Sequence, residues 1–336
     1  MITRLGPSEA TPVLLAALRS NVVVARADAA VVELAGAGAV AAVQGLLTND
    51  VEKPGDAAFV YGALLTPKGM IVVDGWATRL GSTVRLTVPA AGREAALAIC
   101  AKYVPPRLAL TTDRTADSVV LRLAGPRAIA IADAAGIPLP PGASRAVRAA
   151  AAGLACEVAR PAPGAPFALQ ITTAAADAAT VEGRLVRAGA LAAAPAALEL
   201  ERILAGWPAL TSEVDDKTIP QEVRFDEIGG VSYTKGCYTG QETVSRLHFR
   251  GHANRQLRAL EFDAEPPPPA DSLPITRLER EVGRVTSIAW LPDGPGRWIG
   301  LAVLRREVEP GAMVRVGGVD ARVGELPFAS VSLEPA

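Results

Sequence analysis

The sequence predicts an α+β fold, in which two related α/β regions are followed by a small C-terminal β-barrel or sandwich. Two observations indicate this fold: a short internal echo in the first two thirds of the chain, and a change to short strands and turns after Arg255. The length of 336 residues exceeds that of an ordinary single domain. We expect an α/β part over residues 1–250 and this C-terminal β domain over residues 251–336.

The echo is a short sequence similarity between two strand–turn–helix units. Residues 34–41 (LAGAGAVA) resemble residues 123–130 (LAGPRAIA), and each segment follows a short β-type run and opens an Ala-rich helical stretch. The first copy also matches a GxGxxA dinucleotide-binding fingerprint. The second copy has Arg127 in place of the second glycine, so we interpret the motif as a packing turn.

Further elements follow from local patterns. In the α/β part, strands are predicted at 83–88 and 167–171, and helices at 92–103 and 175–188. In the C-terminal part, strands are predicted where short apolar runs alternate with turn residues, at 256–262, 283–290, 298–304 and 313–316, which is the pattern of a small β-barrel or sandwich.

Composition excludes several classes of protein. Half of the residues are hydrophobic and 21% are charged, as in a soluble globular protein. The net charge of −1 argues against stable nucleic-acid binding, and the most apolar stretch, residues 29–47, contains Glu33 and Gln44, which argues against a membrane span. Three widely spaced cysteines and the lack of a signal pattern in residues 1–11 predict a cytoplasmic location.

Residues 235–242 (KGCYTGQE) form the most informative segment. Two glycines predict a tight loop, and Thr239 and Glu242 have the spacing of a helix capping box. Cys237 would then lie ahead of a helix N-terminus, where the helix dipole and Lys235 favour its thiolate. We therefore predict Cys237 as the reactive thiol and Lys235 as its electrostatic partner. The alternatives are an inert core cysteine and a Glu242 that only caps the helix.

The octapeptide resembles the signature of the YgfZ family, folate-binding proteins that support iron–sulfur cluster maturation and are related to the aminomethyltransferase (T-protein) of the glycine cleavage system. Further resemblance lies in segments that span nearly the whole chain: QGLLTNDV at 44–51, residues 61–74, RILAGWP at 202–208, IPQE at 219–222, and Arg246 with Arg250-Gly251. The resemblance implies two ferredoxin-like lobes, interleaved in sequence, and a C-terminal β-barrel around a central channel. It also implies that tetrahydrofolate or a derivative binds in that channel.

Seven residues are predicted to contact this ligand: Tyr61, Asp74, Arg202, Gln241, Glu242, Arg246 and Arg250. Arg246 and Arg250 are four residues apart, as on one face of a helix, and would hold an anionic group such as the glutamate tail of a folate. A solvated helix face is the alternative. Asp74 ends an apolar run, so it is either a polar anchor in a cleft or a turn residue.

The chain departs from the aminomethyltransferases at two acidic positions. Val73 stands where the first of two acids is expected, and Leu204 stands where a glutamate holds the pterin ring. These losses favour an accessory factor for iron–sulfur cluster assembly or repair, with assembly proteins or client enzymes as partners. A tetrahydrofolate-dependent aminomethyl or one-carbon transferase is the alternative, and a thiol redox protein acting through Cys237 is a third possibility. No metal site is predicted, and His248 and His252 are expected to be solvated loop residues.

Overall fold

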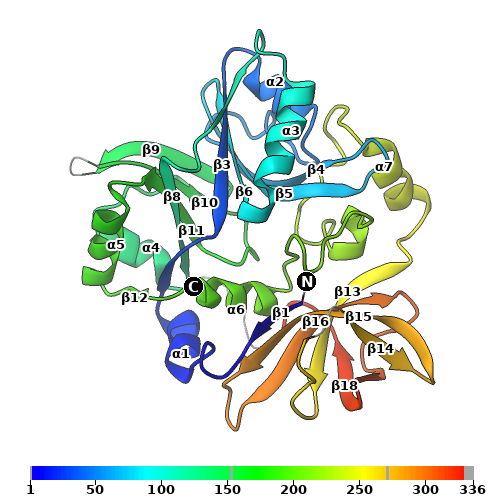
Figure 1. Ribbon diagram of the computed structural model, residues 1–336. Helices are drawn as coiled ribbons and strands as arrows, with labels where there is room; N and C mark the ends of the chain where they lie inside the picture. Colours follow the sequence, from blue (N-terminus) through cyan, green and yellow to red (C-terminus); the bar gives the residue numbers. More distant parts are fainter. Residues whose placement is uncertain (1, 152–153, 270–271, 329–336) are drawn as a thin grey trace.

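In the computed structural model, two sheets with their helices and a β-barrel are arranged around helix α6 (Ala196–Ala205; Figure 1). The structure describes residues 2–151, 154–269 and 272–328. The predicted α+β class, with two interleaved lobes and a barrel, is confirmed. Among the described residues, no helix is long and apolar enough to cross a membrane.

The first lobe is built on a five-stranded antiparallel sheet with the strand order β4-β5-β6-β3-β7. Its strands are β3 (Ala29–Ala35), β4 (Phe59–Leu65), β5 (Ile71–Leu80), β6 (Thr83–Pro89) and β7 (Leu110–Asp113). Helices α2 (Ala39–Gln44) and α3 (Arg93–Tyr103) cover one face of the sheet. Because side chains alternate along a strand, Val60 of β4 packs under the helices, while Tyr61 lies on the opposite face.

The second lobe has a six-stranded sheet with the order β12-β2-β8-β11-β10-β9. Its strands are β2 (Val23–Arg26), β8 (Ser118–Ala124), β9 (Arg145–Ala151), β10 (Leu154–Arg160), β11 (Leu169–Ala174) and β12 (Leu191–Ala192). Helices α4 (Ala128–Ala134) and α5 (Ala178–Arg187) pack on it. Strand β2 precedes every strand of the first sheet in the chain, so the lobes are interleaved.

The internal echo corresponds to the units β3–α2 and β8–α4, one in each lobe. Gly36 and Gly125 occupy the same place in the two turns, with φ angles of 139° and 123°. A Cβ atom would lie 2.9 Å from the oxygen of Leu108 at the first glycine and 2.5 Å from the oxygen of Asn21 at the second. Only glycine fits this close approach of backbone to backbone, which confirms the interpretation as packing turns.

Six strands form the closed antiparallel barrel, because β15 pairs with β16 and completes the ring. They are β13 (Arg255–Phe262), β14 (Leu273–Arg277), β15 (Arg280–Leu291), β16 (Arg297–Arg305), β17 (Met313–Val316) and β18 (Val319–Gly324). Strand β1 (Thr3–Leu5) adds to β15 in parallel, and helix α1 (Pro12–Ser20) follows it. The N-terminal strand therefore lies on the barrel, which the sequence did not predict.

Candidate functional site

A cavity of about 460 Å³ lies where the two lobes, β1 and helix α6 meet. Three of the seven predicted ligand residues line it: Tyr61 of β4, Asp74 of β5 and Arg202 of α6. Arg122 of β8 lines it from the second lobe. This cavity is the central channel that the family resemblance implies.

Asp74 is buried and forms one strong contact in this cavity. The hydroxyl of Tyr61 donates to its Oδ2 atom at 2.7 Å, while Oδ1 has no hydrogen-bond partner among the described residues. Burial raises the pKa of Asp74 to about 6, against the opposing effects of the Tyr61 hydroxyl and the Arg122 charge. Buried polar atoms normally have partners, so an unpaired buried oxygen beside a cavity makes Asp74 a candidate ligand contact.

Arg122 is a charged residue of this cavity that the sequence analysis missed. Its Nε and Nη2 atoms both donate to the side-chain oxygen of Gln170 at 3.2 Å, and its guanidinium lies 4.4 Å from the ring centroid of Phe167. Burial lowers the pKa of Arg122 to about 10, although Asp74 and Tyr61 oppose the shift. The signal in the sequence was a single arginine inside the apolar run VVLRLA.

Aromatic rings form much of the cavity wall. Trp76 stacks on Trp207 with ring centroids 5.8 Å apart and meets Phe167 edge-on at 5.0 Å. Tyr61 packs edge-on against Trp207 at 4.9 Å. Strands β4 and β5 of the first lobe, the loop before β11 of the second lobe and the segment after α6 contribute these rings, which suit a flat, partly apolar ligand.

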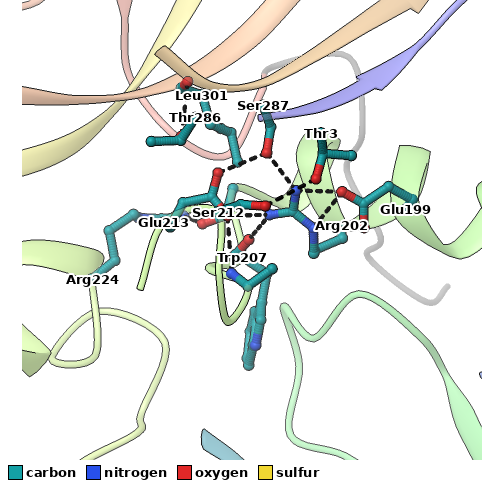
Figure 2. Close-up of polar contacts among 12 residues, drawn as sticks. Thr3, Glu199, Arg202, Trp207, Ser212, Glu213, Arg224, Thr286, Ser287 and Leu301 are labelled. Carbon is teal, nitrogen blue, oxygen red and sulfur yellow. Dashed lines mark hydrogen bonds and ion pairs between the residues drawn. The ribbon is translucent and has the colours of Figure 1, made fainter. Parts of the chain in front are cut away.

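Arg202 lines the same cavity, but its donors bind within the protein (Figure 2). Nη1 donates to the backbone oxygen of Trp207 at 2.5 Å and to Glu213 at 3.0 Å, while Nη2 donates to Glu199 at 2.5 Å and Ser287 at 2.7 Å. Nε also donates to Glu199, so every N–H group of the guanidinium has a partner. Burial alone would lower the pKa of Arg202, but the two carboxylates raise it. Arg202 therefore fastens α6 to barrel strand β15.

Leu204, the position of the expected pterin-binding acid, is fully buried in the core that joins α6 to the barrel. The nearby Glu201 is also buried, and neither of its carboxylate oxygens has a partner among the described residues. Burial raises the pKa of Glu201 to about 8. It borders a separate cavity of about 100 Å³ beside Phe167, so it does not replace the missing acid in the central cavity.

Cys237 is exposed, whereas Cys100 and Cys156 are buried. Helix α7 (Gln241–Arg250) begins shortly after it, as predicted, but the predicted capping box is wrong: the N-cap is Gly240, with φ 84°, and no side chain caps the helix. A Cβ atom at Gly240 would lie 2.6 Å from the backbone oxygen of Thr66. Close packing on the turn after β4 therefore positions this helix end.

Lys235 is buried, and its ammonium group binds main-chain oxygens. It donates to Gln44 at 2.7 Å, Leu47 at 2.6 Å and Asn49 at 2.8 Å. Burial lowers the pKa of Lys235 to about 8, while nearby acidic side chains oppose the shift. Lys235 thus clamps the segment 44–51 onto the thiol loop, and its effect on Cys237 remains a prediction.

The other predicted ligand residues lie outside the central cavity. Glu242, Arg246 and Arg250 are exposed on α7, Gln241 is half-buried, and none of them lines the cavity in the described parts of the chain. The predicted site is thus divided between a cavity and a surface loop. Tyr238, next to the thiol, links the two because it packs in one core cluster with residues of the cavity wall.

The two histidines differ in their surroundings. His248 belongs to α7, stacks on Tyr233 with centroids 3.6 Å apart, and lies 3.2 Å from Asp226, so the expectation of a loop residue was wrong. His252 is exposed beyond the helix. Among the described residues, no group of three or more His, Cys, Asp or Glu side chains could hold a metal ion.

Comparison with known proteins places the chain in a family. The family model for the GCVT N-terminal domain matches residues 15–228, more than half of the chain. A solved structure of the glycine cleavage system aminomethyltransferase T from Bartonella henselae superposes with a TM-score of 0.80 at 19% identity, covering 96% of this chain and 91% of that one. This similarity establishes the fold.

Curated relatives share sequence over part of the chain. "tRNA-modifying protein YgfZ" of Vibrio vulnificus (strain YJ016) is 32% identical over 136 residues, 39% of this chain and 42% of the relative. The protein of the same name from Cronobacter sakazakii (strain ATCC BAA-894) is 33% identical over 147 residues, 42% of each chain. These alignments span less than half of either relative. The chain belongs to the family of the GCVT N-terminal domain, and its resemblance to the YgfZ proteins is confirmed.

Proposed function

We propose that this protein binds tetrahydrofolate or a derivative in the central cavity and serves as an accessory factor in iron–sulfur cluster assembly or repair, acting through Cys237. The free Oδ1 atom of Asp74 in an aromatic-walled cavity carries the folate part of the proposal. A reduced pterin is a flat ring with N–H groups along one edge. Such an edge would supply the missing donor to Asp74, and the ring would pack against Trp76 and Trp207.

The cavity is large enough for this ligand. Its volume of about 460 Å³ lies within the range typical of small-molecule sites, roughly 300–1,000 Å³. In this proposal the glutamate tail leaves the cavity and meets Arg246 or Arg250 on α7. These two arginines are exposed, so each contact would be weaker than a buried charge-assisted hydrogen bond.

Three contacts support a role for the thiol loop. Lys235 ties the loop to the segment 44–51, Tyr238 packs into the core, and Gly240 lies against Thr66. Cys237 is thus an exposed thiol on a fixed loop, where an assembly protein or a client enzyme could reach it. Any cluster or transferred group would be exchanged with that partner at the surface.

Complementation in cells that lack the protein tests the proposal. Wild type, Cys237→Ala and Cys156→Ala would be expressed to equal soluble levels, and the activities of aconitase-type cluster enzymes would be measured. We expect Cys156→Ala to restore these activities and Cys237→Ala to fail. Full rescue by Cys237→Ala would contradict a mechanism centred on the thiol.

A tetrahydrofolate-dependent aminomethyl or one-carbon transferase is the second candidate. The carboxyl group of Asp74 favours it, because a pKa of about 6 lets the group exchange a proton near neutral pH. Against it, Val73 lies in the core on the helix-covered side of the sheet, and Leu204 is sealed by the barrel. An assay of folate-dependent aminomethyl transfer separates the candidates: turnover supports the transferase, and its absence supports the accessory factor.

A further inference from the structure

The central cavity holds a second charged group that the proposed function does not yet use. Arg122 comes from β8 of the second lobe, whereas Asp74 comes from β5 of the first lobe. The two side chains are close enough for each to shift the pKa of the other. A carboxylate and a guanidinium therefore line the same cavity from opposite lobes.

The structure holds Arg122 in a defined orientation. Gln170 accepts from its Nε and Nη2 atoms and itself donates to the hydroxyl of Thr87 in the first lobe at 3.3 Å. Phe167 supports the face of the guanidinium. The remaining nitrogen, Nη1, has no hydrogen-bond partner among the described residues and is not sealed from solvent. One fixed donor thus remains for a ligand.

The acceptor on the other side is fixed in the same way. Asp74 keeps Oδ2 on the Tyr61 hydroxyl, and Oδ1 is left without a partner among the described residues. The cavity is therefore lined by a buried acceptor and a donor that both lack partners among the described residues, on fixed side chains between aromatic walls. A flat ring that carries an N–H donor and a carbonyl acceptor matches both.

We infer that Arg122 and Asp74 form a two-point recognition pair for a lactam heterocycle: Asp74 accepts from ring or amino N–H groups, and Arg122 donates to the ring carbonyl. This inference rests on the proposed function, because the 4-oxo pterin ring of tetrahydrofolate is such a heterocycle. It adds a specificity-determining residue on the second lobe and makes the ligand a bridge between the lobes.

The pair predicts discrimination at the lactam of the ligand. If an amino group replaces the ring carbonyl, the ligand presents a donor to the Arg122 donor, and both are left unpaired. The neighbouring ring nitrogen also loses its N–H, so Asp74 then accepts from the 2-amino group alone. Sites that hydrogen-bond a polar group reject analogues that cannot pair, because the site's own polar groups then lose their partners. We expect wild type to bind the 4-oxo ring at least about tenfold more tightly than the 4-amino ring.

Calorimetry tests this with two ligands, tetrahydrofolate and its 4-amino analogue tetrahydroaminopterin. The proteins are wild type, Arg122→Gln, Arg122→Lys and the surface control Arg107→Gln, each checked for folding by thermal unfolding. Arg107 is exposed and lies outside the cavity. We expect Arg107→Gln to keep the preference for the 4-oxo ring and Arg122→Gln to lose it. Arg122→Lys, which keeps the charge without the planar fork, should retain only part of it.

The outcomes separate this inference from the proposed function. Tight tetrahydrofolate binding without preference in wild type, or an unchanged preference in both Arg122 variants, would overturn the recognition pair and leave folate binding intact. If neither ligand bound to wild type, the proposed function would fail and the inference with it.

Discussion

Tyr61 and Asp74 are diagonal neighbours on the adjacent strands β4 and β5, and the tyrosine hydroxyl lies 2.7 Å from the carboxylate. Despite this hydrogen bond, burial raises the pKa of Asp74 to about 6. An ionised Asp74 therefore costs the folded protein stability at neutral pH. A group retained at such a cost is typical of a binding site rather than of a structural core.

Replacing Asp74 with Asn should stabilise the empty protein at neutral pH and weaken ligand binding. The folded pKa is raised above the usual 3.8, so stability is fully present below about pH 4 and is lost as pH rises through 6. The amide does not ionise, so the gain at pH 7.5 is at most about 3 kcal/mol, and it shrinks towards pH 4.5. Urea denaturation of both proteins at the two pH values measures this. An equal difference at both pH values would contradict the assignment.

Glu201→Gln should also stabilise the folded protein, but over a higher pH range than Asp74→Asn. The pKa of Glu201 is raised from 4.5 to about 8, so its ionisation removes stability progressively from about pH 5 until pH passes 8. We expect the variant to be more stable than wild type by about 2–4 kcal/mol at pH 8.5 and by much less at pH 5. Thermal unfolding at several pH values gives the stability difference between the variant and wild type as a function of pH. Any pH-independent cost of the buried amide adds equally at every pH, so it does not affect the slope of this difference. If the curves of stability against pH run parallel for wild type and Glu201→Gln, Glu201 does not titrate in this way.

Lys235→Ala should destabilise the fold and loosen the segment that contains Leu47. Three backbone oxygens lose their donor, which we expect to cost about 2–4 kcal/mol. Hydrogen exchange at residues 44–51, with urea denaturation, measures both effects. Lys217→Ala removes an exposed lysine and is the matched control. Unchanged exchange in Lys235→Ala would show that the clamp is not needed.

Cys237 should be the first of the three thiols to be alkylated under native conditions. It is exposed, whereas burial raises the pKa of Cys100 to about 11 and also raises that of Cys156. Peptide mapping after brief treatment with iodoacetamide gives the order of reaction. The rate at Cys237 against pH, compared in wild type and Lys235→Ala, tests the predicted electrostatic effect of the lysine. Identical profiles would remove that effect and leave Lys235 as a clamp.

Local signals predicted much of the fold. The two packing turns could be predicted because Gly36 and Gly125 occur in the same local pattern. The barrel strands could be predicted because turn residues separate them. Strand β1 was missed because a three-residue strand has no pattern of its own, and its partner β15 lies far along the chain.

The site was harder to predict, because tertiary contacts determine it. The acceptors for Lys235 lie between 186 and 191 residues away in sequence, so no local pattern contains them. The capping box failed because Gly240 packs against Thr66, and this contact sets the helix end. Arg122 was overlooked because its role depends on a cavity that both lobes complete.

The central claim is that the cavity between the lobes binds a reduced folate, and a tryptophan fluorescence titration tests it most directly. Trp76 and Trp207 line the cavity, whereas the other two tryptophans, Trp290 and Trp298, belong to the barrel strands. After correction for light absorbed by the ligand, tetrahydrofolate should quench wild type and Trp290→Phe saturably, and the double variant Trp76→Phe/Trp207→Phe much less. No saturable change in wild type, or equal quenching in all three proteins, would contradict folate binding in this cavity.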